Sequence, residues 1–151
     1  MNNEKKAAAI KSLEYIEHDC VLGVGTGSTV NYLISELHKV KHKIKLITSS
    51  SQASTALLEE QGFTTDDLSS VGTPDLYIDG ADEITKNFHM IKGGGGALTR
   101  EKIIAHASNQ FICIVDNSKL VDVLGSFPLP IEVIPMAKSM VSREIAILGG
   151  Q

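Results

Sequence analysis

Short apolar runs alternate with amphipathic stretches along the first 115 residues of the chain. The apolar runs have the length of buried strands, and they lie at residues 20–24, 44–48, 75–79 and 111–115. Apolar residues recur with helical spacing within residues 4–17, 30–37, 53–60 and 97–107. Strands that alternate with helices predict an α/β fold with a doubly wound, mostly parallel, Rossmann-like sheet.

The pattern changes after Asp116. The stretch GSFPLPIEVIP places three prolines around one β-branched run, and a last helical pattern covers residues 137–148. The ending LGGQ carries a helix stop signal with no later element to pack against, so we expect a truncated chain. We predict an α/β domain over residues 1–125 and the beginning of a second, incomplete unit over residues 126–151.

Charge and composition narrow the possible partners. The formal net charge is −4, and no basic stripe alternates with aromatic residues, so we expect no nucleic-acid partner. No apolar run approaches the length of a membrane span, and the N-terminus lacks a signal-peptide pattern, so we expect no membrane association. These observations together predict a cytoplasmic protein.

The first unusual loop is GVGTGSTV, residues 23–30. It misses the dinucleotide fingerprint because Ser28 stands where a glycine is required, and Thr48 and Ser49 stand where an acid should hold a ribose. No nucleoside triphosphate loop occurs either. Glycines such as Gly27 and the hydroxyls of Thr26, Ser28 and Thr29 indicate a site for a single phosphate. The alternative is a tight turn capped by Ser28.

The second loop, DGADEI, crowds Asp79, Asp82 and Glu83 after a buried strand. Neighbouring carboxylates repel one another unless a cation, a proton or a ligand hydroxyl relieves them. A solvated turn and a magnesium site are both possible. Sugar hydroxyls are the preferred interpretation, because Mg²⁺ relies on substrate phosphates and a lysine is available to balance the charge.

The third loop, IKGGGGALTREK, covers residues 91–102. Its glycines resemble a flexible linker, but helix formers follow directly. A glycine loop that opens a helix presents free backbone N–H groups to an anion or an oxyanion. Glu101 is either an acid stabilised by the helix dipole or a functional group. Lys119, after the last strand, is either a surface lysine or a phosphate partner, and its position favours the phosphate.

The segments GVGTGST, SSSQAS, DGADEI, KGGGGALTREK and FPLPIEVIP, in this order and spacing, closely resemble ribose-5-phosphate isomerase of the A type. The resemblance spans nearly the whole chain. It implies interconversion of D-ribose 5-phosphate and D-ribulose 5-phosphate in the non-oxidative pentose phosphate pathway, without a metal or another cofactor. The reaction requires ring opening, removal of a proton from C2, a cis-enediolate and return of the proton at C1.

The resemblance also implies roles for residues of this chain. Glu101 is expected to be the base, and Lys92 with the N–H groups of Gly93 to Gly95 is expected to stabilise the oxyanion. Asp79 and Asp82 are expected to hold sugar hydroxyls and assist ring opening. The expected substrate-binding residues are Lys5, Thr26, Gly27, Ser28, Thr29, Gly80, Ala81, Gly93, Gly94, Gly95 and Lys119.

Members of that family continue beyond the length of this chain, with a small α+β lid domain that begins at FPLPIEVIP and is incomplete here. They are typically dimers or tetramers, so a homodimer or homotetramer is expected. The alternative function is a module that binds a sugar phosphate without turnover. A related amino-sugar-phosphate deaminase is disfavoured, because it would need a base and a ring-opening histidine arranged differently, and no suitable histidine lies near the motifs.

Overall fold

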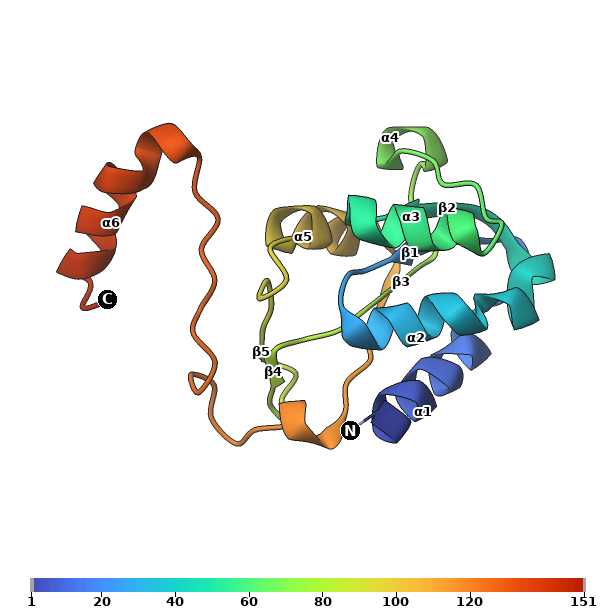
Figure 1. Cartoon of the computed structure of the whole chain (residues 1–151), viewed down its shortest axis with the longest axis horizontal. Coiled ribbons are helices and arrows are strands. Elements are labelled where there is room, and N and C mark those ends of the chain that lie inside the picture. Colours follow the sequence, from blue (N-terminus) through green and yellow to red (C-terminus); the bar gives the residue numbers. More distant parts are fainter. Residues whose placement is uncertain (1, 151) are drawn as a thin grey trace.

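The computed structural model describes residues 2–150 of the chain. Its centre is a four-stranded parallel sheet with the strand order β2-β1-β3-β6 (Figure 1). The strands are β1 (Cys20–Val24), β2 (Ile44–Ser49), β3 (Leu76–Asp79) and β6 (Gln110–Cys113). Each strand comes from one of the four predicted apolar runs, and the predicted α/β fold is confirmed.

Helices connect the strands. The α-helices are α1 (Asn2–Ser12), α2 (Ser28–Glu36), α3 (Gln52–Glu60), α4 (Leu68–Val71), α5 (Leu98–Ala107) and α6 (Lys138–Ile147). Short 3₁₀ helices follow or separate them: η1 (Leu13–Tyr15), η2 (Leu37–Lys43), η3 (Asn117–Lys119) and η4 (Pro135–Ala137). The short helix α4 was not expected from the sequence, because four residues are too few to show a helical period.

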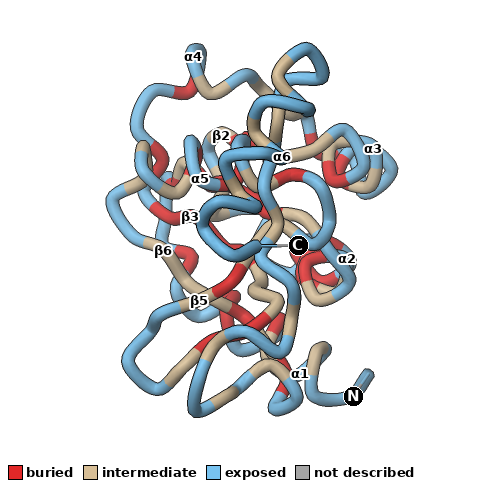
Figure 2. Tube along the Cα trace, turned by 90° about the vertical axis from the view of Figure 1, so that its left-hand side faces the viewer, coloured by how far each residue is buried: buried red, intermediate tan, exposed pale blue. Residues whose placement is uncertain are grey.

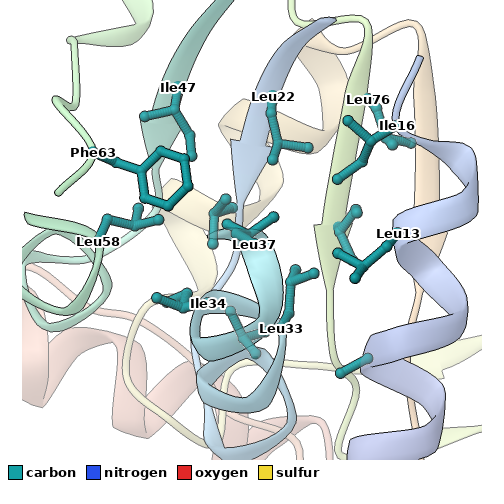
Figure 3. Packing of buried hydrophobic residues seen from close by; sticks show 14 of the residues in the cluster. Leu13, Ile16, Leu22, Leu33, Ile34, Leu37, Ile47, Leu58, Phe63 and Leu76 are labelled. Atoms are coloured by element: carbon teal, nitrogen blue, oxygen red, sulfur yellow. The ribbon is translucent and has the colours of Figure 1, made fainter. Parts of the chain in front are cut away.

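One face of the sheet packs against α1 and α2. Side chains alternate along a strand, so Leu22 of β1 and Leu76 of β3 point to this face, where they meet Leu33 and Leu37 (Figure 3). Leu22, Leu33 and Leu37 are completely buried. Burying such a side chain contributes roughly 1.5–3 kcal/mol, so this cluster fixes α2 and with it the loop that precedes the helix.

The opposite face packs against α5. Here Gly23 of β1 faces Tyr77 of β3 and Ile104 of α5, and a Cβ atom at position 23 would lie 2.9 Å from both side chains. The ring of Phe111 on β6 stacks on that of Tyr77, with centroids 5.6 Å apart. The absence of a side chain at Gly23 therefore lets α5 approach the sheet closely.

A small antiparallel hairpin, β4 (Glu83–Ile84) and β5 (Met90–Ile91), follows β3. The sequence suggested only a polar loop here, and that expectation is corrected. Two-residue strands carry no alternating pattern, and the turn between them uses a positive φ of 62° at Phe88. The hairpin returns the chain to the end of β3, which brings Lys92 back beside Asp79.

The C-terminal segment, residues 126–150, leaves the body of the molecule and ends in α6 (Figure 1). Figure 2 shows this segment almost entirely exposed, whereas buried residues concentrate in the body. Ile134, Met136 and Ile147 are exposed by 74%, 95% and 84%. The boundary at residues 125/126 stays a prediction. Within residues 2–150, every helix is too short or too polar to cross a membrane.

Candidate active site

The loops that follow β1, β3 and β5 meet in one cavity of about 140 Å³. The loops after β1 and β3 leave the same edge of the parallel sheet, which is where ligands of α/β proteins bind. The antiparallel hairpin β4–β5 brings the third loop to that edge. Every predicted site residue except Asp79 lines this cavity. The three loops are far apart in the sequence, and the fold brings them together in one cavity.

One end of the cavity lies at the start of α2. Gly27, with a φ of 121°, is the N-cap residue of that helix and makes no side-chain cap. The alternative that Ser28 caps the turn is therefore wrong, and the Ser28 hydroxyl instead accepts a hydrogen bond of 2.8 Å from Nζ of Lys5. Thr26 shares a 2.7 Å hydrogen bond with Ser50. A lysine thus stands beside a helix N-terminus, an arrangement that suits an anion.

Asp116 supports this end of the cavity and was missed in the sequence. Its Oδ1 accepts hydrogen bonds from the backbone N–H of Ser118 (2.9 Å) and from the hydroxyl of Ser118. Asp116 thereby caps η3, the 3₁₀ helix that carries Lys119. Its Oδ2 lies 4.0 Å from Nζ of Lys5. The hydrogen bonds from Ser118 lower the pKa of Asp116 below its usual value, although burial opposes the shift. The sequence signal that could have indicated this role is the Asp-x-Ser spacing of Asp116 and Ser118, because aspartate is a preferred helix N-cap residue.

Asp79 lies beneath the cavity and is completely buried. Its Oδ1 accepts hydrogen bonds from the backbone of Thr26 (3.0 Å) and Gly80 (2.7 Å). Its Oδ2 accepts from the hydroxyl of Tyr77 (2.6 Å) and from Nζ of Lys92 (2.8 Å). Four protein donors hold this carboxylate, so its expected contact with sugar hydroxyls stays a prediction.

Gly25 makes room for this buried carboxylate. A Cβ atom at position 25 would lie 2.0 Å from Cγ and from Oδ1 of Asp79. Such a distance is impossible between non-bonded atoms, so the loop and the end of β3 can meet only around a glycine. The sequence showed that the glycine was there without showing what it accommodates.

Lys92 links Asp79 to Glu101. Its Nζ lies 3.3 Å from Oε2 of Glu101 and also donates to the carbonyl oxygen of Gly80. Burial lowers the pKa of Lys92, but the charges of Asp79 and Glu101 outweigh burial and raise the pKa above its usual value. Lys92 is therefore a charged ammonium at neutral pH.

Glu101 lies in the first turn of α5 and is 3% exposed. Among the described residues, its Oε2 finds no partner in hydrogen-bonding geometry, although Lys92 is close. Burial raises the pKa of Glu101 above its usual value, the charge of Asp79 adds to the rise, and Lys92 opposes it. A buried carboxylate with an unsatisfied oxygen and a raised pKa is a candidate general base.

The glycine run forms a turn that leads into α5, so it is not a linker. Gly93 has a φ of 100°, and the N–H of Gly96 donates to its carbonyl oxygen at 2.9 Å. The N–H of Gly94 donates to Oδ2 of Asp82 at 2.8 Å. One of the three N–H groups expected to stabilise an oxyanion is therefore engaged by Asp82 in this state.

Glu83 departs from the acidic cluster that the sequence suggested. It is buried on β4, and its carboxylate accepts hydrogen bonds from the backbone N–H groups of Gly125 (2.8 Å) and Phe127 (2.6 Å). Asp79, Asp82 and Glu83 each take different donors. Over residues 2–150, no three histidine, cysteine or acidic side chains are grouped to hold a metal ion.

Phe127 borders the glycine run as a consequence of that contact. A Cβ atom at Gly94 would lie 2.7 Å from Cζ of Phe127 and 2.6 Å from Oδ1 of Asp82. Glu83 therefore holds the start of the C-terminal segment against the glycine turn. This role of Glu83 was not predictable, because a sequence pattern does not tell to which side an acid in a turn points.

Comparisons with known proteins agree with this geometry. The family model for ribose 5-phosphate isomerase A (phosphoriboisomerase A) matches residues 46–151. Ribose-5-phosphate isomerase A from Legionella pneumophila (strain Corby) is 56% identical over 150 residues, which are 99% of this chain and 69% of that protein.

Solved structures give the same result. Ribose 5 phosphate isomerase A from Neisseria gonorrhoeae matches with a TM-score of 0.96 and 45% identity, over 99% of this chain and 67% of that one. A D-ribose-5-phosphate isomerase in complex with phospho-erythronic acid matches with a TM-score of 0.89 and 40% identity, over 96% of this chain and 66% of that one. The chain belongs to the ribose 5-phosphate isomerase A family.

Proposed function

We propose that this chain interconverts D-ribose 5-phosphate and D-ribulose 5-phosphate, with Glu101 as the base that moves the proton. The observation that carries the proposal is the buried Glu101 carboxylate beside the Lys92 ammonium, in a cavity that has two more lysines at its other end. The reaction belongs to the non-oxidative pentose phosphate pathway.

The lysine end is where the phosphate binds. Lys5 and Lys119 supply positive charge, and the N-terminus of α2 adds backbone N–H groups and the hydroxyl of Ser28. A phosphate held there fixes one end of a five-carbon chain. The binding energy then positions the reacting carbons at the opposite end of the cavity.

The chemistry occurs beside Glu101. In the open-chain aldose, the Glu101 carboxylate removes the C2 proton, the C2 electron pair forms a C1–C2 double bond, and the C1 carbonyl oxygen becomes an oxyanion. The Lys92 ammonium stabilises that charge. Glu101 returns the proton to C1, while the hydroxyl proton of O2 moves to O1, which yields the ketose. Burial raises the pKa of Glu101, and this makes it a stronger base.

The two aspartates have different tasks in this proposal. Asp82 lines the cavity and is available to sugar hydroxyls and to ring opening. Asp79 is enclosed by protein donors and keeps Lys92 in place. A related structure holds phospho-erythronic acid, which joins a phosphate to a short hydroxylated chain, and this agrees with a sugar phosphate as the ligand of the family.

Glu101→Gln tests the base. We expect turnover to fall by about 10³-fold or more, since general bases contribute typically about 10²–10⁴-fold. Binding of inorganic phosphate should stay unchanged, because the lysine end is intact. In deuterated water the wild-type product should gain deuterium at the reacting carbon. The matched control is Glu60→Gln, which changes an exposed acid at the end of α3.

Two results would count against the proposal. Turnover retained by Glu101→Gln would exclude Glu101 as the base. A wild-type chain that binds inorganic phosphate but converts neither sugar would favour the alternative, a binding module without turnover.

A further inference from the structure

Tyr77 is a buried hydroxyl that the proposed mechanism does not use. It precedes Asp79 by two positions on β3, so both side chains point to the same face of the sheet. Its ring stacks on Phe111 at an interplanar angle of 24°, and Gly23 and Ile104 enclose it from the other side. The hydroxyl is therefore held in one place, 2.6 Å from Oδ2 of Asp79.

The same oxygen of Asp79 also receives Lys92. Oδ2 accepts from Tyr77 at 2.6 Å and from Nζ of Lys92 at 2.8 Å, and that Nζ lies 3.3 Å from Glu101. We propose that Tyr77 is a positioning residue whose hydroxyl sets how Lys92 is divided between Asp79 and Glu101. This inference rests on the proposed function, in which Glu101 is the base and Lys92 stabilises the oxyanion.

The hydroxyl acts as a permanent donor. Burial and the charge of Asp79 raise the pKa of Tyr77 well above its usual range, so the phenol stays protonated. Burial also raises the pKa of the nearby Cys113 thiol to about 11, so this thiol on β6 stays neutral. The charged groups that act on Glu101 are then Asp79 from β3, Asp82 from the following turn and Lys92 after β5.

Removing the Tyr77 hydroxyl should draw the Lys92 ammonium toward Asp79 and away from Glu101. Without the Tyr77 donor, Oδ2 of Asp79 has only Lys92 to neutralise it and draws the ammonium more strongly. Glu101 then loses part of its favourable contact with Lys92 and feels more of the charge of Asp79. Both changes disfavour the ionised carboxylate of Glu101. The ammonium is also drawn away from the oxyanion it should stabilise.

Tyr77→Phe is the direct test, measured on the full chain. We expect kcat to fall by about tenfold, as for loss of a hydrogen bond to a charged group, with KM within about twofold of the wild type. The acidic limb of the profile of kcat/KM against pH, which reports ionisation of the free enzyme, should move to higher pH by about half a unit. Tyr32→Phe is the control, because it removes a hydroxyl from α2 outside the cavity.

A second measurement avoids the removal of any group. In a Tyr15→Phe/Tyr32→Phe background, Tyr77 is the only tyrosine left of the three in the chain. Biosynthetic replacement of Tyr77 by fluorotyrosine makes the hydroxyl more acidic and a stronger donor while keeping its shape. The acidic limb should then move the opposite way, to lower pH. This measurement decides the matter if Tyr77→Phe does not fold.

The outcomes separate the inference from the function it rests on. An unchanged kcat and an unchanged acidic limb in folded Tyr77→Phe, or an unmoved limb with fluorotyrosine, would overturn the inference even if Glu101→Gln is inactive as proposed. A change in KM alone would also overturn it. Turnover retained by Glu101→Gln, or no turnover by the wild type, would overturn both.

Discussion

At one end of the cavity the ammonium of Lys92 contacts the carboxylates of Asp79 and Glu101, and Asp82 lines the wall. At the other end Lys5 and Lys119 line the wall, and the carboxylate of Asp116 lies 4.0 Å from Nζ of Lys5. The first end therefore has an excess of negative charge and the second an excess of positive charge. A substrate with a phosphate at one terminus and an uncharged sugar at the other matches this division. In the proposed function, these charges orient the substrate before any hydroxyl is contacted.

The two ends also differ in how their lysines are held. Nζ of Lys92 contacts two buried carboxylates and a backbone carbonyl, while Nζ of Lys5 contacts a neutral hydroxyl and lies 4.0 Å from a carboxylate. A lysine enclosed by carboxylates is part of the structural framework. A lysine with little compensation is free to take a phosphate as its partner. In the proposed function, lysine therefore has a different task at each end of the cavity.

Among the variants that test this contrast between the two ends, Lys92→Met has the largest expected effect. Losing an oxyanion donor commonly costs about 10²–10³-fold in rate, and we expect such a loss of kcat. Removal of the ammonium also leaves Asp79 and Glu101 as neighbouring buried charges, and breaking a buried ion pair typically destabilises by about 3–5 kcal/mol. Assays of kcat and urea unfolding measure the two effects.

The matched control for this prediction is Lys102→Met, which removes an exposed lysine one position beyond Glu101. Lys102→Met should change neither kcat nor the urea concentration at which the chain unfolds. If Lys92→Met unfolds at the same urea concentration as the wild type, the ammonium is not part of the structural framework, and the contrast between the two ends disappears.

A smaller effect is expected at the opposite end from Lys5→Gln. One charge-assisted hydrogen bond to a phosphate should be lost, so we expect KM to rise by about tenfold, or about 1.4 kcal/mol, with kcat nearly unchanged. The control is Lys6→Gln, because the neighbouring lysine pairs with Glu36 instead. A fall in kcat with an unchanged KM would mean that the two ends do not divide binding from chemistry as proposed.

The smallest effect concerns stability and pH. Burial raises the pKa of Glu101 in the folded chain, so the folded state holds this proton to higher pH than the unfolded state does. Stability is then lost as the pH rises from the unfolded pKa through the folded pKa. Glu101→Gln lacks this loss. The measured quantity is the midpoint of thermal unfolding of Glu101→Gln minus that of the wild type. This difference should be larger at about pH 7 than at about pH 4, and an equal difference at both would contradict the prediction.

The main sheet was predictable because each of its strands is a compact apolar run between breaks. The location of the site followed from one rule, that the carboxyl ends of parallel strands share an edge. That rule placed Thr26 and Asp82 together correctly, although more than 50 residues separate them, whereas Lys92 reaches the same cavity through the hairpin β4–β5. The hairpin β4–β5 was not predictable, since its strands are too short to show a period.

The direction and burial of the acids were also not predictable. Asp82 and Glu83 are adjacent in the sequence, but one lines the cavity and the other binds the backbone of residues 125–127. Asp79 is buried because Tyr77, Lys92 and two backbone N–H groups all donate to it. Such burial depends on contacts between distant segments, which a pattern along one chain does not contain.

Gly25 has a practical consequence for anyone who wishes to change what this cavity accepts. Mutagenesis of the loop after β1 is the obvious route to new substrates, since Thr26, Ser28 and Thr29 line the cavity. Position 25 must be left out of such a library, because any side chain there would occupy the space of Asp79. A library that randomises the whole loop would consist mostly of misfolded members, and its failures would say nothing about specificity.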